Sequence, residues 1–462
     1  MVIFWTILME GAIGKHPWIP FTMGLRYVIA PWFLTFVVAA CGFVIGDWLV
    51  GSRVPSGGIR DVYLAGIGMS VISVVTFLAG LAGLVYPIAF LVEGVVVLGL
   101  GWRRLLGLLG RIGAGVYGIR RWRVEEIVMI GLIAWYVYNT IALTCNPSIG
   151  WDTGNSHLAA PKWYLREHAI RFLPWINFNN FPQLVEMLGM LVMAGVGDPG
   201  GTISYMFLLG QCLIIYSLVQ DRTAGLVAVL VWLSMPFATR YSQEMYVEMA
   251  LAFYCLLAVH SLVAWKRPDL AGIAAGGALS VKYTAAPFVI LLAILAGRKG
   301  WWRLLLWCIP IAAAWYIRNI VLFGNPVFPF MDHWARLPGL GTVPETVRSA
   351  LIIDHNEMLR NFKLSWREVP GSIWWATMTE REPWVRSHRP ASTGPWLLAL
   401  LPVIGIAARE KSRWPVLGLA AAYLLYWVVL ERIWDSRYLV AIWPLLCVAV
   451  GWGIKDIMRW FK

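Results

Sequence analysis

Long apolar stretches separated by short polar segments make up most of the sequence. A helix that crosses a bilayer needs about 20 predominantly apolar residues. The pattern predicts an all-α, polytopic transmembrane bundle of about 12–13 helices, with exoplasmic loops and juxtamembrane helices. The predicted crossing segments are 27–50, 62–83, 84–102, 125–145, 201–219, 223–239, 249–265, 269–282, 284–297, 302–322, 392–408, 414–431 and 438–455.

The composition agrees with a membrane protein. Of 462 residues, 59% are hydrophobic and only 14% are charged, whereas about a quarter of a soluble domain is charged. The 28 Trp and 17 Tyr suit the membrane interface. The net charge of +13 is attributed to cytoplasmic loops and a phosphate-bearing lipid ligand, so no nucleic-acid partner is expected.

Basic residues predict the orientation of the chain. The Arg-rich loop that ends at Arg123 is expected in the cytoplasm. The apolar segment 183–197 is interpreted as an exoplasmic or re-entrant helix, because the later short basic loops then also lie inside. This topology makes 146–200 and 323–390 exoplasmic.

Polar residues divide the chain into two modules. Residues 1–123 form an N-terminal helical module with few polar groups, which is a candidate surface for a membrane-protein partner. Residues 124–462 form the predicted catalytic module, where nearly all notable polar residues lie. The six cysteines are scattered, so free thiols are expected.

The first exoplasmic loop contains Asp152, His157 and Lys162. A carboxylate at the lipid–water boundary is partly desolvated and therefore suits a general base, which is the role proposed for Asp152. The alternative is that Asp152 or Thr153 caps a helix. His157 is a candidate substrate ligand or a structural hydrogen bonder, and Lys162 binds a phosphate or extends to the interface.

A second acidic pair is formed by Glu244 and Glu248, which are four residues apart and would share one face of a helix. Like charges at that spacing are costly unless a cation or ligand lies between them. Glu248 begins an apolar span, where buried polar groups are usually functional. Arg240 and Glu244 are candidate substrate-binding residues, and a salt bridge between them is the alternative.

Basic residues follow on three further exoplasmic segments. Lys282, Arg318 and Arg437 are candidate phosphate ligands. Each has a plainer alternative, such as snorkelling for Lys282 or neutralisation of Arg437 by Asp435. The neighbouring candidates for substrate binding are Tyr283, Asn319 and Tyr438.

No cofactor is firmly expected, although a divalent metal stays open. The loop 323–390 contains several acidic and histidine side chains, but their spacing matches no standard metal site. A surface loop is the favoured interpretation for Asp332, His333, Asp354, His355 and Glu357.

The order of these motifs resembles that of bacterial glycosyltransferases of the C superfamily, which include protein O-mannosyltransferases and aminoarabinose transferases. The resemblance covers roughly residues 125–455. Its pieces are Trp151-Asp152, His157, Pro161-Lys162-Trp163-Tyr164, Phe181-Pro182-Gln183, Glu186, Tyr246-Val247-Glu248, Lys282-Tyr283-Thr284, Arg318-Asn319, Gly324-Asn325-Pro326, Gly394-Pro395 and Arg437-Tyr438.

The resemblance implies a polyprenyl-phosphate sugar donor and inverting transfer to a glycan, lipid or protein acceptor. The reaction would occur on the exoplasmic face of a bacterial inner membrane. Asp152 matches the catalytic acidic residue of the family's first loop. Glu248 matches a second acidic position, where the family more often has Asp.

Two other classes of function stay open. A lipid or solute transporter would also be apolar and polytopic, but transporters often show repeats and polar groups at the membrane midplane. Here no repeat is evident and the polar groups are predicted at one face. A non-catalytic membrane scaffold that keeps the glycosyltransferase fold is the other alternative, and Glu at position 248 mildly favours it.

Overall fold

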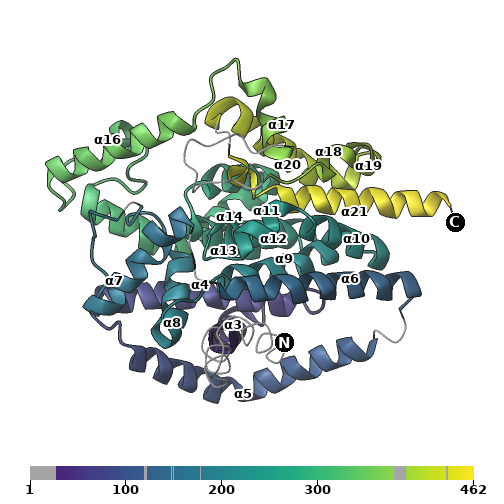
Figure 1. The fold of residues 1–462 in the computed structure, drawn as a ribbon, viewed down its shortest axis with the longest axis horizontal. Helices are drawn as coiled ribbons and strands as arrows, with labels where there is room; N and C mark the ends of the chain where they lie inside the picture. The colour runs from purple at the N-terminus through teal and green to yellow at the C-terminus, as the bar shows by residue number, and fades with distance from the viewer. Residues whose placement is uncertain are drawn as a thin grey trace, which may run out of the picture.

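A computed structural model describes residues 28–118, 122–146, 148, 150–176, 178–378, 392–432 and 435–461. These residues form helices and loops without a β-strand (Figure 1). The α-helices are α3 Ala30–Val50, α4 Arg60–Leu81, α5 Pro87–Gly118, α6 Val124–Ile141, α7 Ala159–Glu167, α8 Leu184–Val196, α9 Thr202–Val219, α10 Arg222–Leu233, α11 Pro236–Ser242, α12 Glu248–Val263, α13 Pro268–Val281, α14 Ala285–Phe323, α15 Asp332–Ala335, α16 Glu345–Phe362, α17 Ser372–Thr377, α18 Trp396–Ala399, α19 Leu401–Ala407, α20 Trp414–Tyr426 and α21 Trp443–Trp460.

Several of these helices are long and apolar enough to cross a membrane. In the described part of the chain they number six, or seven if the bent pair α10 and α11 counts as one span. The six are Ala30–Val50, Arg60–Leu81, Val124–Cys145, Thr202–Val219, Ala285–Phe323 and Lys411–Glu431. The all-helical fold was predicted, and these helices fit a polytopic membrane bundle.

By length and apolar composition, the described chain has fewer crossing helices than the 12–13 that were predicted. Several predicted spans are shorter helices: α12 has 16 residues and α13 has 14. At about 1.5 Å per residue they extend roughly 24 and 21 Å, less than the roughly 30 Å of a hydrocarbon core. The predicted segments 284–297 and 302–322 both fall in α14, where Gly297 has φ 68° and ψ −178° and interrupts the helical geometry.

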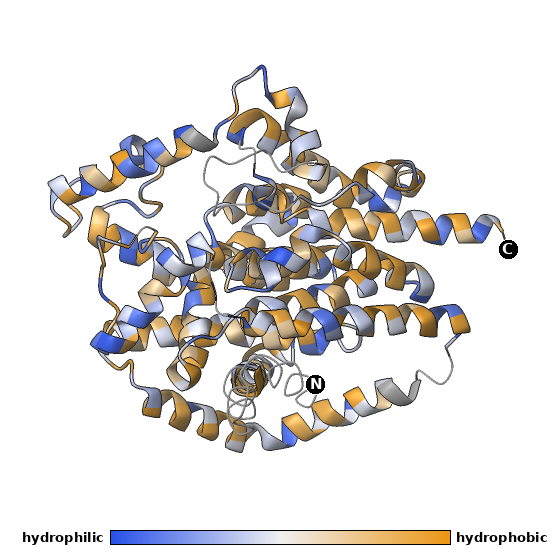
Figure 2. Cartoon of the chain, viewed as in Figure 1, coloured by the Kyte–Doolittle hydropathy of each residue, from blue (hydrophilic) through white to orange (hydrophobic). Residues whose placement is uncertain are grey.

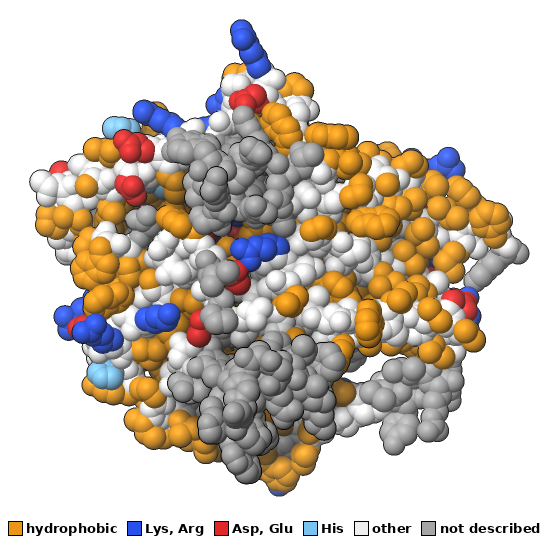
Figure 3. Space-filling view, viewed as in Figure 1, with side chains coloured by type: hydrophobic (Ala, Val, Ile, Leu, Met, Phe, Trp, Pro, Cys, Tyr) orange, Lys and Arg blue, Asp and Glu red, His pale blue; other side chains and the backbone are white. Residues whose placement is uncertain are grey.

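Apolar side chains also cover the outside of the bundle. Leu91 and Leu100 on α5 and Trp135 on α6 are each more than 60% exposed. Apolar residues mark the outer helices in Figure 2 and gather over much of the face seen in Figure 3. Such surfaces are unfavourable in water but suit a hydrocarbon environment.

The chain brings its polar loops to two opposite ends of the helices. At one end, Arg104 pairs with Asp47 and Arg111 pairs with Asp61, each at 2.8 Å. Arg267 at the end of α12 belongs to the same group, since it donates to the carbonyl of Arg53 at 2.8 Å. The loops with Asp152, Glu248, Lys282 and Arg437 lie at the other ends of their helices. The basic residues expected in the cytoplasm are thus separated from the candidate site, but the predicted Arg-rich loop is wrong over its first part, because Arg104 and Arg111 lie within helix α5.

Helices α3 and α4 pack at a distance that only glycine permits. A Cβ atom on Gly68 would lie 1.7 Å from the carbonyl oxygen of Gly42, and one on Gly46 would lie 2.0 Å from that of Leu64. Both obstacles are backbone atoms, so no side-chain movement can remove the clash. Close approach at small residues is a common way to join helices in membranes.

We therefore expect Gly68→Ala to lower the free energy of unfolding by about 1–3 kcal/mol, the usual cost of overpacking. The thermal midpoint in detergent is the measurement. Gly99→Ala on α5 is the matched control, because a Cβ there has no neighbour within 4 Å. Equal midpoints for the two variants would contradict the close packing of α3 on α4.

Candidate functional site

One cavity of about 880 Å³ lies at the end of the bundle where α12 begins and α13 ends. Its charged and ionisable lining groups include Asp152, His157, Glu186, Glu248, Lys282 and Arg437. Aromatic and apolar side chains form most of the remaining wall, among them Trp151, Phe178, Phe181, Tyr283, Tyr316, Phe330, Tyr426 and Tyr438. The cavity therefore combines a compact charged group with a large apolar wall.

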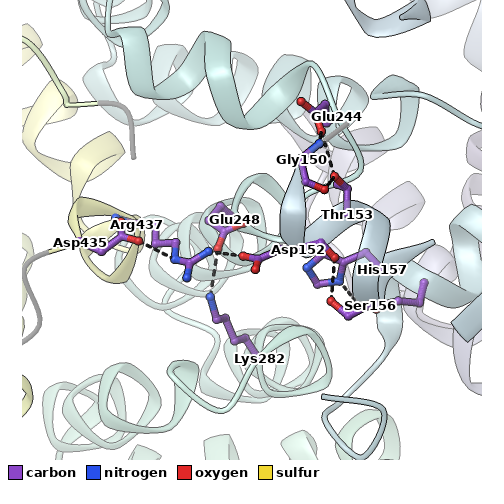
Figure 4. A network of polar contacts seen from close by, with 11 residues as sticks. Gly150, Asp152, Thr153, Ser156, His157, Glu244, Glu248, Lys282, Asp435 and Arg437 are labelled. Carbon is purple, nitrogen blue, oxygen red and sulfur yellow. Dashed lines mark hydrogen bonds and ion pairs between the residues drawn. The ribbon is translucent and has the colours of Figure 1, made fainter. Parts of the chain in front are cut away.

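Arg437 connects two carboxylates that are far apart in the sequence. Its guanidinium forms an ion pair with Asp152 and another with Asp435, the latter at 2.8 Å between Nε and Oδ2 (Figure 4). Asp152 makes no capping hydrogen bond at the start of the short helix Thr153–His157. The side chain of Asp152 therefore does not cap this helix.

Glu248 and Lys282 form the second ion pair of the cavity. Lys282 Nζ lies 3.0 Å from Glu248 Oε1, and Glu248 is only 1% exposed. The ammonium group of Lys282 also lies 5.1 Å from the ring centroid of Tyr438. Removing charges from water is costly unless each is paired, so the two residues depend on each other.

Glu244 does not share a helix face with Glu248, contrary to the prediction. Helix α11 ends at Ser242 and α12 begins at Glu248, so Glu244 lies in the break between them. Its carboxylate accepts hydrogen bonds from the Gly150 amide at 2.6 Å and the Thr153 hydroxyl at 2.9 Å.

Arg240 supplies the third partner of Glu244, at 2.5 Å, so the salt bridge weighed as an alternative is present. Neither residue of this pair lines the cavity. Glu244 instead fixes the loop from which Asp152 projects, and Figure 4 shows its contacts with Gly150 and Thr153 beside the Asp152 group.

His157 pairs with Glu186 in the wall of the cavity. Nδ1 of His157 lies 2.6 Å from Glu186 Oε1. Burial on its own lowers the pKa of His157, but the hydrogen bond and the charge of Glu186, with Asp152 and Glu248 nearby, outweigh it and raise this pKa above 6.5. Folding therefore favours the protonated form of His157.

The remaining predicted ligands divide between the wall and its support. Tyr283 and Tyr438 line the cavity. Asn319 donates to the Tyr283 hydroxyl at 2.5 Å, and buried Arg318 donates to the carbonyl of Asn179 at 2.7 Å. Arg318 and Asn319 do not line the cavity, so they support its wall.

Lys162 is exposed on α7 and is also absent from the lining. A phosphate bound in this cavity would not reach Lys162 without movement of the chain. Snorkelling to the interface, the plainer interpretation of Lys162, fits this placement.

Sequence reasoning missed part of the lining. Glu186 lies in the apolar helix α8, and a lone carboxylate in such a helix was the signal that could have identified it. Asp354, His355 and Glu357 on α16 also line the cavity, so the interpretation of this segment as a plain surface loop was incomplete.

His355 is 7% exposed and lies beside the rings of Phe181 and Phe330. Burial lowers the pKa of His355 to about 4, so the side chain is neutral at pH 7. Over the residues that the structure describes, no group of three His, Cys, Asp or Glu side chains is arranged to hold a metal ion.

Replacement of Glu244 by Ala should increase the mobility of the loop before Asp152. The buried amide of Gly150 would lose its acceptor, which costs about 1–3 kcal/mol of stability for an unsatisfied buried group. The thermal midpoint and the rate of proteolysis within 146–153 measure the effect. Glu345→Ala removes an ion-paired but largely exposed carboxylate; a similar loss there would contradict a specific role for Glu244.

The His157–Glu186 pair predicts a pH-dependent contribution to stability. Because folding raises the pKa of His157, the stabilisation is complete below pH 6.5 and declines as the pH rises through the raised value. The difference in thermal midpoint between wild type and His157→Gln should therefore shrink as the pH rises above 6.5. A difference that is constant or grows with pH would contradict a protonated His157.

Comparisons with known proteins give no family for this chain. No protein-family model, no curated protein and no solved structure matches it.

Proposed function

We propose that the protein is an integral membrane glycosyltransferase that moves a sugar from a polyprenyl-phosphate donor to an acceptor on the exoplasmic side of a bacterial inner membrane. The observation that carries this proposal is the convergence of Asp152, Lys282 and Arg437, from three separate segments, on one large cavity. A carboxylate base and two phosphate-binding cations are what such a transfer requires.

The apolar wall suits a lipid-linked donor. A phosphodiester that carries a long isoprenoid chain needs a charged contact for its headgroup and an apolar path for its tail. The cavity offers both, since its charged residues lie beside aromatic side chains such as Tyr283, Tyr316 and Tyr438. A soluble sugar nucleotide would gain little from this wall.

In the proposed reaction, Asp152 takes the proton of the acceptor nucleophile, which attacks the anomeric carbon of the sugar. The bond between that carbon and the phosphate oxygen breaks, and its electron pair stays on the phosphate. Lys282 and Arg437 stabilise the additional negative charge of the leaving polyprenyl phosphate. Glu248 holds Lys282 in place at 3.0 Å, so we assign it a positioning role.

Helix α16 contributes a further part of the cavity wall. Asp354 and Glu357 are exposed on the helix and line the cavity. Helix α16 lies at the periphery of the molecule, apart from the central helices such as α9 and α12 (Figure 1). We assign this part of the wall to the acceptor, because the donor headgroup is already accounted for by Lys282 and Arg437.

The proposal is tested by sugar transfer in reconstituted vesicles with radiolabelled polyprenyl-phosphate sugars. Asp152→Asn should reduce turnover by about 10²–10⁴-fold, the usual contribution of a general base, while donor binding remains. Arg437→Gln should weaken donor binding. Glu345→Gln, on the exposed start of α16, is the control and should keep wild-type turnover.

Two outcomes would contradict the proposal. Equal turnover in wild type and Asp152→Asn would remove Asp152 as the base. Absence of donor binding in every protein would favour a transporter or a non-catalytic scaffold instead.

A further inference from the structure

We propose that the donor phosphate and Asp152 compete for Arg437, so that phosphate binding releases the Asp152 carboxylate toward the acceptor. This inference rests on the proposed function and adds an order of events to it. The donor must bind before the base becomes available.

The geometry makes Arg437 the shared partner. Its guanidinium forms ion pairs with Asp152 on one side and Asp435 on the other (Figure 4). Lys282, another cation of the cavity, is engaged by Glu248. Both side chains are therefore already paired with carboxylates, and a phosphate that bonds to Nη1 of Arg437 takes the place of Asp152 there.

Asp435 is the partner that stays. It is 2% exposed and accepts a hydrogen bond from the backbone amide of Arg437 at 2.9 Å. It is only two residues from Arg437, at the start of the short helix Ser436–Leu439. Its contact with Arg437 is thus set by local backbone geometry.

Asp152 is the partner that can leave. It comes from a different loop, 285 residues away in the sequence. Its side chain is 13% exposed and lines the cavity, so an oxygen released from Arg437 turns toward open space. Asp435, in contrast, would remain enclosed.

Exchange also avoids an unpaired buried charge. Arg437 is 9% exposed, and a buried guanidinium without a partner is strongly unfavourable. When the phosphate replaces Asp152, Arg437 keeps an anion on each side throughout. The released carboxylate meets the acceptor hydroxyl at the moment when the donor is in place.

The test uses undecaprenyl phosphate and the full-length protein in nanodiscs. If Asp152 competes with the phosphate, Asp152→Asn should bind undecaprenyl phosphate about tenfold more tightly than wild type. Glu431→Gln is the matched control, because Glu431 lines the same cavity but bonds to the Tyr426 hydroxyl and has no ion pair with Arg437 or Lys282 in the part of the chain described. Its affinity should stay close to that of wild type.

A second measurement uses the wild-type protein and does not depend on the folding of a variant. Carbodiimide coupling of an amine to Asp152, quantified by mass spectrometry, should increase severalfold when undecaprenyl phosphate is added. The exchange of Asp152 for phosphate on Arg437 is supported if Asp152→Asn binds the lipid more tightly and the control variant does not. It is also supported if labelling of Asp152 increases with added lipid.

Three results would overturn it. Equal affinity of wild type and Asp152→Asn, or an equal gain in Glu431→Gln, shows that Asp152 does not compete for Arg437. Labelling of Asp152 that falls with added lipid shows that its carboxylate becomes protected. If no protein binds undecaprenyl phosphate, the proposed function itself fails, which is distinguishable from the first two results because binding is then absent throughout.

Discussion

The ion pairs around Arg437 are the interaction on which the candidate site depends. Charges placed among apolar helices are tolerated only when they are paired. Arg437 therefore draws the loop after α6, through Asp152, to the turn before α21, where Asp435 lies. This connection closes one end of the bundle and gives the cavity its charged wall.

The surrounding structure keeps these charges in position. Glu244 fixes the loop before Asp152 through Gly150 and Thr153, although it does not reach the cavity. Arg318 fixes the turn at Asn179 in the opposite wall. Residues of the same chemical type thus either line the cavity or hold its wall in place. Which of the two they do depends on where the backbone places them.

The contact between α3 and α4 shows how the N-terminal helices take part in the same core. Glycine lets their backbones approach closely, and residues of both helices pack with α9, α12 and α13. Both helices also pack against α8, which carries the cavity residue Glu186. Helix α5 instead presents exposed apolar side chains along much of its length.

The sequence alone determined the helical class, the long apolar helices and the segments that carry the charged site, because these follow from apolar length and from the cost of isolated charges among apolar side chains. It also identified Asp152, Glu248, Lys282 and Arg437, which line one cavity. Only the tertiary structure decided that Glu244 turns away from Glu248, that Lys162 lies outside, and that Glu186 and His355 face inward. Those outcomes depend on where a helix breaks and on contacts between distant segments, which local spacing does not encode.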